Sequence, residues 1–340
     1  MTRHAPVKTC GTILFIALAV FVQCGAGHDR LLRSPKSKPV AFREVWGYLM
    51  RGEEMELKGN EPLTDICYFS ARMDRNGKLA GPRDLPGALK SRSVRWHLVV
   101  AEISNSLLIG TCINPSLPAR ENLLKEIIIF SGAYSGVQID FEAVAPGDRD
   151  NFFSFLADLK ARLGPGKILS VALPARVRKV TGAYDYAAAA AVADRVIIMA
   201  YDQHWSTGEP GPVASLPWCR DVVAYAKSEI PGGKLIMGVP LYGRAWQEVQ
   251  HSGAIRDTHV REILSRKRPK VEVDPEKGPS MVYTEKVRVR AYFNTLESLT
   301  ERTRLYSQEE ALGVAFWRIG QGDPRLWEYI TVAAAANESK

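Results

Sequence analysis

Eight short apolar runs recur along the chain from residue 44 to residue 320, and this recurrence constrains the fold more than any other feature. Each run has the length and composition of a buried strand, and segments with helical spacing lie between most of them. Strands that alternate with helices form a parallel sheet, and eight such units predict an α/β fold, the (β/α)8 TIM barrel. The runs are 44–50, 63–71, 96–103, 136–144, 167–175, 195–202, 234–243 and 313–320.

A doubly wound open sheet is the competing architecture. Open sheets that bind dinucleotides carry a G-x-G-x-x-G turn after a strand, and no such turn follows any of the eight runs. The barrel is therefore the preferred prediction, for a domain from 41 to 335. Segment 244–300 interrupts the alternation with charged, strand-like sequence and is too long for an ordinary connection. It predicts a small β-containing insertion between the seventh and eighth strands.

The first 27 residues have the pattern of a secretory signal peptide. A basic stretch, MTRHAPVK, precedes the apolar run GTILFIALAVFV, which is too short to span a bilayer comfortably. We therefore expect export to the periplasm, the cell surface or the medium. Cys24 lies in a loose lipoprotein-type box, so membrane attachment through its lipidation is an alternative to cleavage near Ala26 or Gly27, or to an uncleaved anchor. The polar segment 28–40 predicts a linker.

The formal net charge of +8 does not mark a nucleic-acid-binding protein. Its densest run, RKRPK at 266–270, has no interleaved aromatic residues and indicates a solvated loop. Three cysteines lie outside the export segment, so one disulfide between two of them is possible. Neither these cysteines nor the six histidines of the chain have the spacing of a metal site. We expect a monomer with no nucleic-acid partner and no metal. The cysteines are Cys67, Cys112 and Cys219.

Polar side chains occupy every second position in the middle of the run GVQIDFEAV. Successive side chains of a strand point to opposite faces, so Gln138, Asp140 and Glu142 share one face, which would look into the barrel. Glu142 would lie nearest the C-terminal end of the strand, where barrel enzymes carry their active sites. A solvent-exposed edge strand would show the same alternation but fits poorly among eight alternating units. The opposite face, expected to pack under helices, holds Val137, Ile139 and Phe141.

Two carboxylates one pleat apart indicate acid–base chemistry. In a site poor in water, Asp140 and Glu142 cannot both ionise at low cost, so one of them is expected to hold a proton near neutral pH. A protonated glutamic acid at the mouth of a barrel is a general acid.

The same run resembles the active-site strand of glycoside hydrolase family 18, which contains chitinases and N-acetylglucosaminidases. The family pattern D-G-x-D-x-D-x-E corresponds to S-G-V-Q-I-D-F-E in this chain, from Ser135 to Glu142. Asp140 and Glu142 match that pattern. Ser135 and Gln138 replace its first two aspartates.

Three further segments resemble the family in the expected order. MAYDQHW at 199–205 is similar to M-x-Y-D, MGVPLYGRAW at 237–246 is similar to G-x-P-x-Y-G, and GVAFWRIG places Trp317 where the family keeps a tryptophan. Segment 201–218 resembles the branch that includes spore-cortex-lytic and other peptidoglycan-acting N-acetylglucosaminidases. The resemblance extends over residues 44–330.

The resemblance implies retaining hydrolysis of a β-1,4 bond after N-acetylglucosamine, without a cofactor, in peptidoglycan or, as second choice, in chitin. In this family the acetamide of the substrate replaces a protein nucleophile. Glu142 would be the acid and then the base, Asp140 would accept the acetamide N–H, and Tyr201 would donate to the acetamide carbonyl. The implied substrate-binding residues are Tyr48, Gln138, Met199, Asp202, Tyr242 and Trp317.

The departures from the family pattern carry their own expectations. The neutral Gln138 removes a buried charge from beside Asp140, which lowers the proton affinity of the carboxyl pair and shifts the pH profile of an active enzyme. Ser135, at the start of the strand, is expected to serve structure alone. The alternative function is a chitinase-like lectin, a glycan-binding surface protein. Such lectins typically lack the glutamate, and because Glu142 is present, hydrolysis is preferred.

Overall fold

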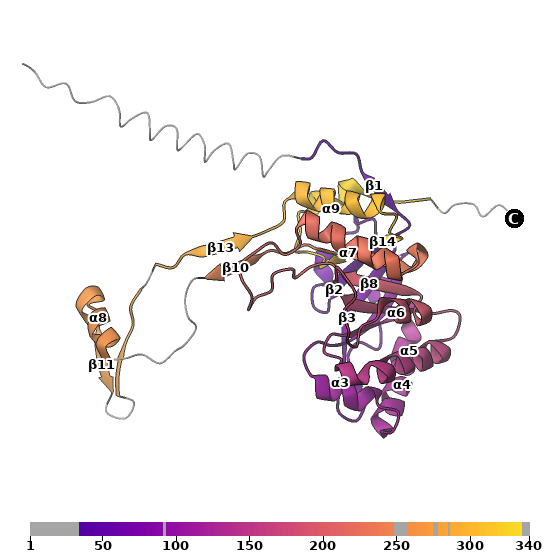
Figure 1. Cartoon of the computed structure of the whole chain (residues 1–340), viewed down its shortest axis with the longest axis horizontal. Coiled ribbons are helices and arrows are strands. Elements are labelled where there is room, and N and C mark those ends of the chain that lie inside the picture. Colours follow the sequence, from indigo (N-terminus) through magenta and orange to yellow (C-terminus); the bar gives the residue numbers. More distant parts are fainter. Residues whose placement is uncertain (1–33, 91–92, 248–256, 275–277, 285, 335–340) are drawn as a thin grey trace, which may run out of the picture. The chain divides into compact units, whose positions relative to one another are not determined.

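The computed structural model describes residues 34–90, 93–247, 257–274, 278–284 and 286–334 (Figure 1). The expected signal peptide and Cys24 lie outside the described residues. Two compact units make up the chain. Of the described residues, the first unit holds those up to Gln203, then Ala214–Tyr242, and those from Asn294 onward. The second holds His204–Val213 and Gly243–Phe293.

The first unit is a closed barrel of eight parallel strands. Each strand pairs with two parallel neighbours, and β2 pairs with both β3 and β14, so the ring closes. The predicted TIM barrel is confirmed, and each predicted run contains most of one strand. The strands are β2 (Glu44–Met50), β3 (Asp65–Met73), β5 (Arg95–Glu102), β6 (Gly136–Phe141), β7 (Ile168–Pro174), β8 (Arg195–Met199), β9 (Leu235–Pro240) and β14 (Gly313–Trp317).

Helices surround the barrel and bury its outer surface (Figure 1). The ring of Phe141, on β6, has its centroid 6.1 Å from that of Phe155 and 6.4 Å from that of Phe152, both on the following helix. Val137 and Ile139 belong to the same outer core, as the alternation predicts. The helices are α2 (Gly87–Lys90), α3 (Ser106–Ile113), α4 (Pro118–Phe130), α5 (Arg149–Leu163), α6 (Tyr186–Val192), α7 (Leu216–Glu229) and α9 (Leu296–Gln308).

Short elements complete this unit. An antiparallel strand β4 extends the sheet beside β3, and β1 pairs in parallel with β15. Short 3-10 helices connect larger elements in the described part of the chain. Their bounds are β1 (Val40–Phe42), β4 (Leu79–Ala80), β15 (Ile330–Val332), η1 (Glu54–Glu56), η2 (Ser131–Ala133), η3 (Pro146–Asp148), η4 (Gly232–Lys234) and η5 (Pro324–Tyr329).

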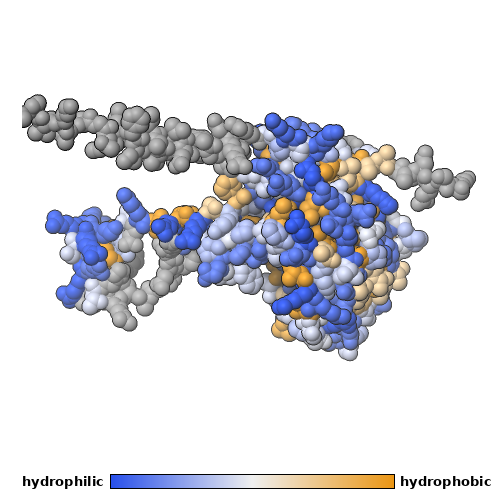
Figure 2. Space-filling view, turned by 45° about the horizontal axis from the view of Figure 1, so that its top comes forward, coloured by the Kyte–Doolittle hydropathy of each residue, from blue (hydrophilic) through white to orange (hydrophobic). Residues whose placement is uncertain are grey.

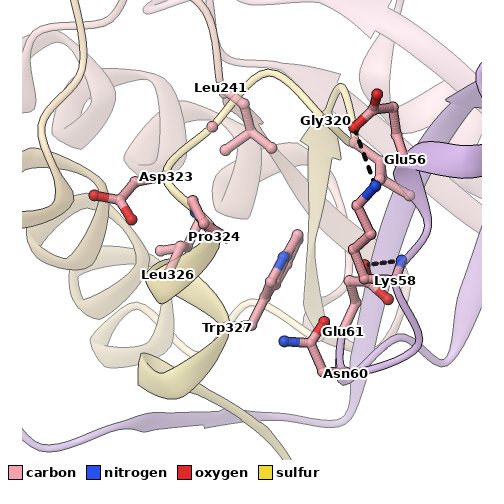
Figure 3. Close-up of a pocket in the computed structure, with 12 residues that line it drawn as sticks. Glu56, Lys58, Asn60, Glu61, Leu241, Gly320, Asp323, Pro324, Leu326 and Trp327 are labelled. Carbon is pink, nitrogen blue, oxygen red and sulfur yellow. Dashed lines mark hydrogen bonds and ion pairs between the residues drawn. The ribbon is translucent and has the colours of Figure 1, made fainter.

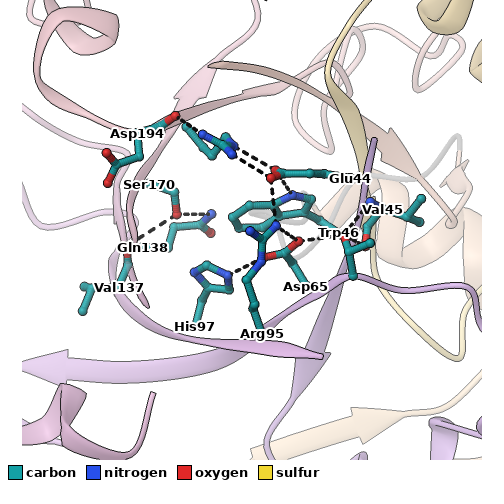
Figure 4. A network of polar contacts seen from close by, with 12 residues as sticks. Glu44, Val45, Trp46, Asp65, Arg95, His97, Val137, Gln138, Ser170 and Asp194 are labelled. Carbon is teal, nitrogen blue, oxygen red and sulfur yellow. Dashed lines mark hydrogen bonds and ion pairs between the residues drawn. The ribbon is translucent and has the colours of Figure 1, made fainter. Parts of the chain in front are cut away.

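Charged side chains fill the N-terminal end of the barrel interior (Figure 4). Glu44 accepts hydrogen bonds from Arg95 at 2.8 Å and from two nitrogens of Arg195 at 2.8 and 2.7 Å. The indole of Trp46 donates to the same carboxylate at 3.0 Å. Burial alone would raise the pKa of Glu44, but the hydrogen bonds and charges of Arg195 and Arg95 lower it to about 2.

Asp65 extends this network. It accepts two hydrogen bonds from Arg95, at 2.8 and 2.7 Å, and lies 2.7 Å from Nε2 of His97. The fully buried imidazole of His97 stacks at a tilt on Trp46, with ring centroids 4.4 Å apart. Two carboxylates therefore face two guanidinium groups. Charges are tolerated in a protein interior when they are paired and hydrogen-bonded in this way.

The second unit consists of strand pairs and one helix. Strand β10 pairs antiparallel with β13, and β11 pairs antiparallel with β12. Trp246 and Tyr292 pack edge to face across the first pair, with ring centroids 5.9 Å apart. The expected insertion at 244–300 includes all these elements, and α9 begins before its expected end, at Leu296. The bounds are β10 (Arg244–Gln247), α8 (Asp257–Lys267), β11 (Val271–Asp274), β12 (Gly278–Met281) and β13 (Val289–Tyr292).

The cysteines of the described residues form no disulfide. Cys67, Cys112 and Cys219 are free and buried, so each acts as a small core side chain. On the face shown in Figure 2, hydrophobic residues are interspersed with hydrophilic ones. Within the described ranges, no helix has the length and apolar character that crossing a membrane requires. The same ranges contain no cluster of three or more histidine, cysteine, aspartate or glutamate residues suited to a metal.

Candidate active site

Strand β6 carries the predicted carboxylates to the C-terminal end of the barrel. Asp140 faces Ala101 of β5 in register, and the backbone N–H of Glu142 donates to the carbonyl of Glu102 at 3.0 Å. The ladder thus continues to Glu142, one residue beyond the strand. Since side chains alternate along it, Gln138, Asp140 and Glu142 follow one another up the inner face.

The two carboxyl groups differ in their access to water. Asp140 is 4% exposed, and its Oδ1 has no hydrogen-bond partner among the described residues. Burial, and then the nearby charge of Glu142, raise the pKa of Asp140 to about 8. Glu142 is exposed at the mouth, yet the surrounding protein displaces part of its water. This desolvation, and then the charge of Asp202, raise the pKa of Glu142. Asp140 can therefore hold a proton at neutral pH in the free protein.

Two more polar groups lie unpaired in the barrel interior near Asp140. Tyr48 is 2% exposed and Gln138 is fully buried. Gln138 donates from Nε2 to the hydroxyl of Ser170 at 3.3 Å (Figure 4). Its Oε1 and the hydroxyl of Tyr48 have no partner of standard geometry among the described residues. Unpaired buried polar groups are costly, and in native proteins they mark places where a function, a water or a ligand compensates.

Tyr201 and Asp202, which follow the end of β8, lie near the two carboxyl groups of Asp140 and Glu142. Burial, and then the charge of Asp140, raise the pKa of Tyr201 well above its ordinary value. The ring of Tyr201 meets that of Tyr242 edge to face, with centroids 6.3 Å apart, and the hydroxyl of Tyr242 donates to Asp202. Asp202 has a positive φ of 58°. Met199, the last residue of β8, is half-buried on the same inward face as Ile197.

The first glycine of the segment MGVPLYG, Gly238, is required for steric reasons. A Cβ on Gly238 would lie 2.9 Å from the ring of Tyr201 and 2.7 Å from the carbonyl oxygen of Ile198. These distances are shorter than a Cβ atom tolerates, so any larger residue at position 238 would displace the ring of Tyr201.

Trp317 lies half-buried at the C-terminal end of β14. Its ring meets that of Tyr48 at a centroid distance of 5.1 Å and an angle of 63°, and that of Phe69 at 5.1 Å and 79°. The structure therefore brings Trp317 and Tyr48 together, as it does Tyr201, Asp202 and Tyr242. Phe69 was missed by the sequence analysis, because only the register of β3 places it on the inner face.

Tyr184 is a second residue that the sequence analysis missed. Its hydroxyl donates to the carbonyl of Phe141 at 2.8 Å and accepts from the N–H of Val144 at 2.9 Å. These two backbone groups flank Glu142, so Tyr184 holds the turn that carries the exposed carboxyl. No local pattern marks it, because its partners lie at the end of β6 and just after it, 40 or more residues earlier.

A separate cavity of 330 Å³ opens at the same end of the barrel (Figure 3). Leu241 and the indole of Trp327 line it, opposite Lys58 and Asn60. Lys58 donates to the carbonyl of Met55 at 2.7 Å, so its charged group is held by the protein itself. None of the predicted site residues lines this cavity.

Comparisons with known proteins agree with this geometry. The sequence profile of "Glycosyl hydrolases family 18" matches residues 119–322. A putative sporulation-specific glycosylase YdhD of Bacillus subtilis is 29% identical over 287 residues, which cover 78% of this chain and 68% of the relative. The cortical fragment-lytic enzyme of Bacillus anthracis is 27% identical over 292 residues, 80% of this chain and 68% of that enzyme.

A solved structure shares the architecture. The spore cortex-lytic enzyme SleL of Bacillus cereus superposes with a TM-score of 0.69 at 25% sequence identity. The match covers 88% of this chain and 76% of the SleL chain. The barrel fold therefore has a counterpart in an enzyme named for lysis of the spore cortex.

Proposed function

The chain belongs to the glycosyl hydrolases of family 18, and from that premise we propose that it cleaves β-1,4 bonds after N-acetylglucosamine, with retention, through the acetamide of the substrate. The observation that supports this most is the buried Oδ1 of Asp140, which lies beside the exposed Glu142 and has no hydrogen-bond partner among the described residues. An acceptor kept free next to a general acid suits a substrate that brings its own N–H.

The first step needs a proton on Glu142. In the free protein, burial favours the protonated form of Asp140. A hydrogen bond from the acetamide N–H favours its ionised form instead, so substrate binding leaves the proton on Glu142. Glu142 then protonates the glycosidic oxygen while the bond from that oxygen to the anomeric carbon breaks. The acetamide carbonyl oxygen bonds to the same carbon and forms an oxazolinium ion.

The second step regenerates the protein. The carboxylate of Glu142 takes a proton from water, whose oxygen attacks the anomeric carbon and opens the oxazolinium ring. Two displacements at one carbon restore its configuration. The ionised Asp140 stabilises the positive charge of the intermediate throughout. Tyr201, which lies close enough to Asp140 for that charge to raise its pKa, donates to the acetamide carbonyl and orients it.

The aromatic residues would hold the sugar at the cleavage point. Trp317 offers an indole face to the C–H face of a pyranose ring, and Tyr48 and Phe69 fix that indole by edge contacts. Asp202, already hydrogen-bonded to Tyr242, would accept from polar groups of the sugar.

The proposed polymer is peptidoglycan, with chitin second. Two relatives are named for lysis of spore cortex or its fragments, and the N-terminal pattern is that of an exported protein. We propose that the protein is exported and acts on N-acetylglucosamine-containing glycan outside the cytoplasm, as a monomer.

Digestion of purified peptidoglycan, with mass analysis of the fragments, tests the proposal. The expected fragments end in reducing N-acetylglucosamine. Fragments that end in reducing N-acetylmuramic acid would assign a different cleavage class. Stable binding of glycan with no release of reducing ends would instead support the lectin alternative.

A further inference from the structure

The connection between β7 and α6, residues 175–185, carries charges that the proposed chemistry does not use. Arg176, Arg178 and Lys179 lie within four consecutive positions, on the strand end that also carries Glu142. Arg178 and Lys179 are exposed, and neither forms an ion pair or hydrogen bond within the described part of the chain. Exposed cations at the C-terminal end of a barrel attract anionic groups of a ligand.

The base of this connection is fixed to the catalytic strand. Arg176 donates to the carbonyls of Val180 at 2.9 Å and Tyr184 at 2.5 Å, which folds the loop back on itself. Tyr184 in turn hydrogen-bonds on both sides of Glu142. Asp185 accepts from Arg149, the first residue of α5, at 2.9 Å. The cationic tip is therefore held in a defined place relative to the catalytic carboxyl.

A cavity of 200 Å³ lies beneath the tip. Arg149, Arg176 and Lys179 line it together with two acids, Asp185 and Glu229. The backbone N–H of Ala188, followed by the charges of Arg149 and Lys179, lowers the pKa of Asp185. Its charge is already matched by the pair with Arg149. With the neighbouring Arg178 included, cations outnumber acids at this edge.

Apolar side chains alternate with the cations at the tip. Val177 is 44% exposed and Val180 is 48% exposed. Small apolar contacts beside an unpaired charge suit a carboxylate on a short aliphatic or peptidyl arm better than an inorganic ion. A polymer of N-acetylglucosamine alone has no such group, whereas peptidoglycan bears carboxylates on alternate sugars and their peptides.

We propose that the β7–α6 connection binds carboxylates carried by the substituents of the glycan, and so favours peptidoglycan over neutral chitin-like polymers. This inference rests on the proposed function of the same site. The protein would then recognise the negative charge of its substrate as well as the N-acetylglucosamine unit.

The test uses the full chain with the double substitution Arg178→Glu/Lys179→Glu. The control is Arg43→Glu/Arg220→Glu, which makes the same change in net charge at two other exposed positions. The value of kcat/KM is measured on peptidoglycan fragments and on a neutral chitooligosaccharide of equal length. We expect the ratio of the two values to fall about tenfold in the first variant alone, because charges at a rim govern encounter with a charged partner.

Two conditions identify the attracting group. High salt should remove most of the difference between the wild type and the variant, since exposed charges are screened beyond about 3 Å at 1 M ionic strength. Amidation of the carboxylates of peptidoglycan should reduce wild-type turnover to that of the variant. If amidation had no effect while the substitutions did, carboxylates would not be the ligand.

Several results would overturn the inference. These are an unchanged ratio, an equal loss on both substrates, and an equal loss in the control variant. Weaker binding to phosphatidylglycerol vesicles with unaltered hydrolysis would assign the surface to a membrane instead. If the wild type hydrolyses neither substrate, the proposed function fails. Co-sedimentation with insoluble peptidoglycan, compared between wild type and variant, still decides whether the loop binds carboxylates.

Discussion

The two ends of the barrel interior treat buried carboxyl groups in opposite ways. At the N-terminal end, each carboxylate oxygen of Glu44 and Asp65 has a hydrogen-bond partner. At the C-terminal end, Asp140 Oδ1 has none within the described ranges, and Gln138 Oε1 and the Tyr48 hydroxyl have none of standard geometry there. The carboxyl pKa values reflect this contrast, since that of Glu44 is lowered to about 2 and that of Asp140 is raised to about 8.

The difference separates stability from function. Paired charges at one end stabilise the closed ring of strands. Unpaired polar groups at the other end destabilise the free protein but remain available for hydrogen bonds with a substrate. In TIM barrels generally, the C-terminal face carries the active site and the N-terminal face serves stability. Substitutions of the same chemical kind should therefore have opposite effects at the two ends.

The largest effect on stability is expected for Glu44→Gln. It removes the charge shared by Arg95 and Arg195, and breaking a buried ion pair costs about 3–5 kcal/mol of the free energy of unfolding. Because folding lowers the pKa of Glu44 from 4.5 to about 2, its stabilisation is present above pH 4.5 and is lost as the pH falls toward 2. Urea unfolding at neutral and acid pH measures both effects. Glu301→Gln, on the exposed face of α9, is the control, and equal stability of Glu44→Gln and wild type at neutral pH would refute the role of the network.

Asp140→Asn should change stability in the opposite direction. Folding raises the pKa of Asp140 from 3.8 to about 8, so its contribution to the free energy of unfolding falls as the pH rises between these values. The neutral amide escapes this cost and should stabilise the protein by roughly 2–4 kcal/mol near neutral pH, while kcat falls by about 10²-fold. Thermal unfolding and initial rates measure the two effects. A destabilised variant would break the comparison between the two ends.

Tyr184→Phe should reduce kcat more than it changes KM. It removes both hydrogen bonds that flank Glu142, so the free energy of unfolding should fall by about 1–3 kcal/mol and kcat by about tenfold, through misplacement of the acid. Steady-state kinetics of fully folded variant provide the check. A loss of stability with unchanged kcat would restrict Tyr184 to a structural role.

Gln138→Asp should have the smallest effect, a shift of the alkaline limb of the pH–rate profile upward by about one unit. A buried like charge beside Asp140 raises the proton affinity of the carboxyl pair. Ser170→Ala, which removes the partner of Gln138 without adding charge, should leave that limb in place. An unchanged profile in Gln138→Asp would mean that the neutral residue does not set the pH range.

Part of this account could be predicted from the sequence because the signals are local. Buried strands are apolar throughout, so eight runs predicted the barrel, and the alternation in GVQIDFEAV predicted which side chains of β6 face inward. The predicted C-terminal boundary of segment 244–300 was less accurate. Helix α9 begins at Leu296, four residues before that boundary, where Thr295 and Ser298 form a capping box.

The remaining features depend on register between distant strands. Glu44 and Arg195 are 151 residues apart, and no motif pairs them. Tyr184 reaches Phe141 only because β6 and β7 are neighbours. Single polar residues in otherwise apolar runs mark such partners only after the strand order is known, which is why the sequence did not reveal the N-terminal network or the support of Glu142.

The most direct test of the account is the rate at which reducing ends appear when peptidoglycan is incubated with wild type and with Glu142→Gln. Because the side chain is exposed and folding raises its pKa, the variant should be at least as stable as the wild type, which circular dichroism and thermal unfolding verify first. The account predicts that the rate falls by about 10²- to 10⁴-fold, the contribution of a general acid. A folded Glu142→Gln variant that hydrolyses the glycan at the wild-type rate would contradict it.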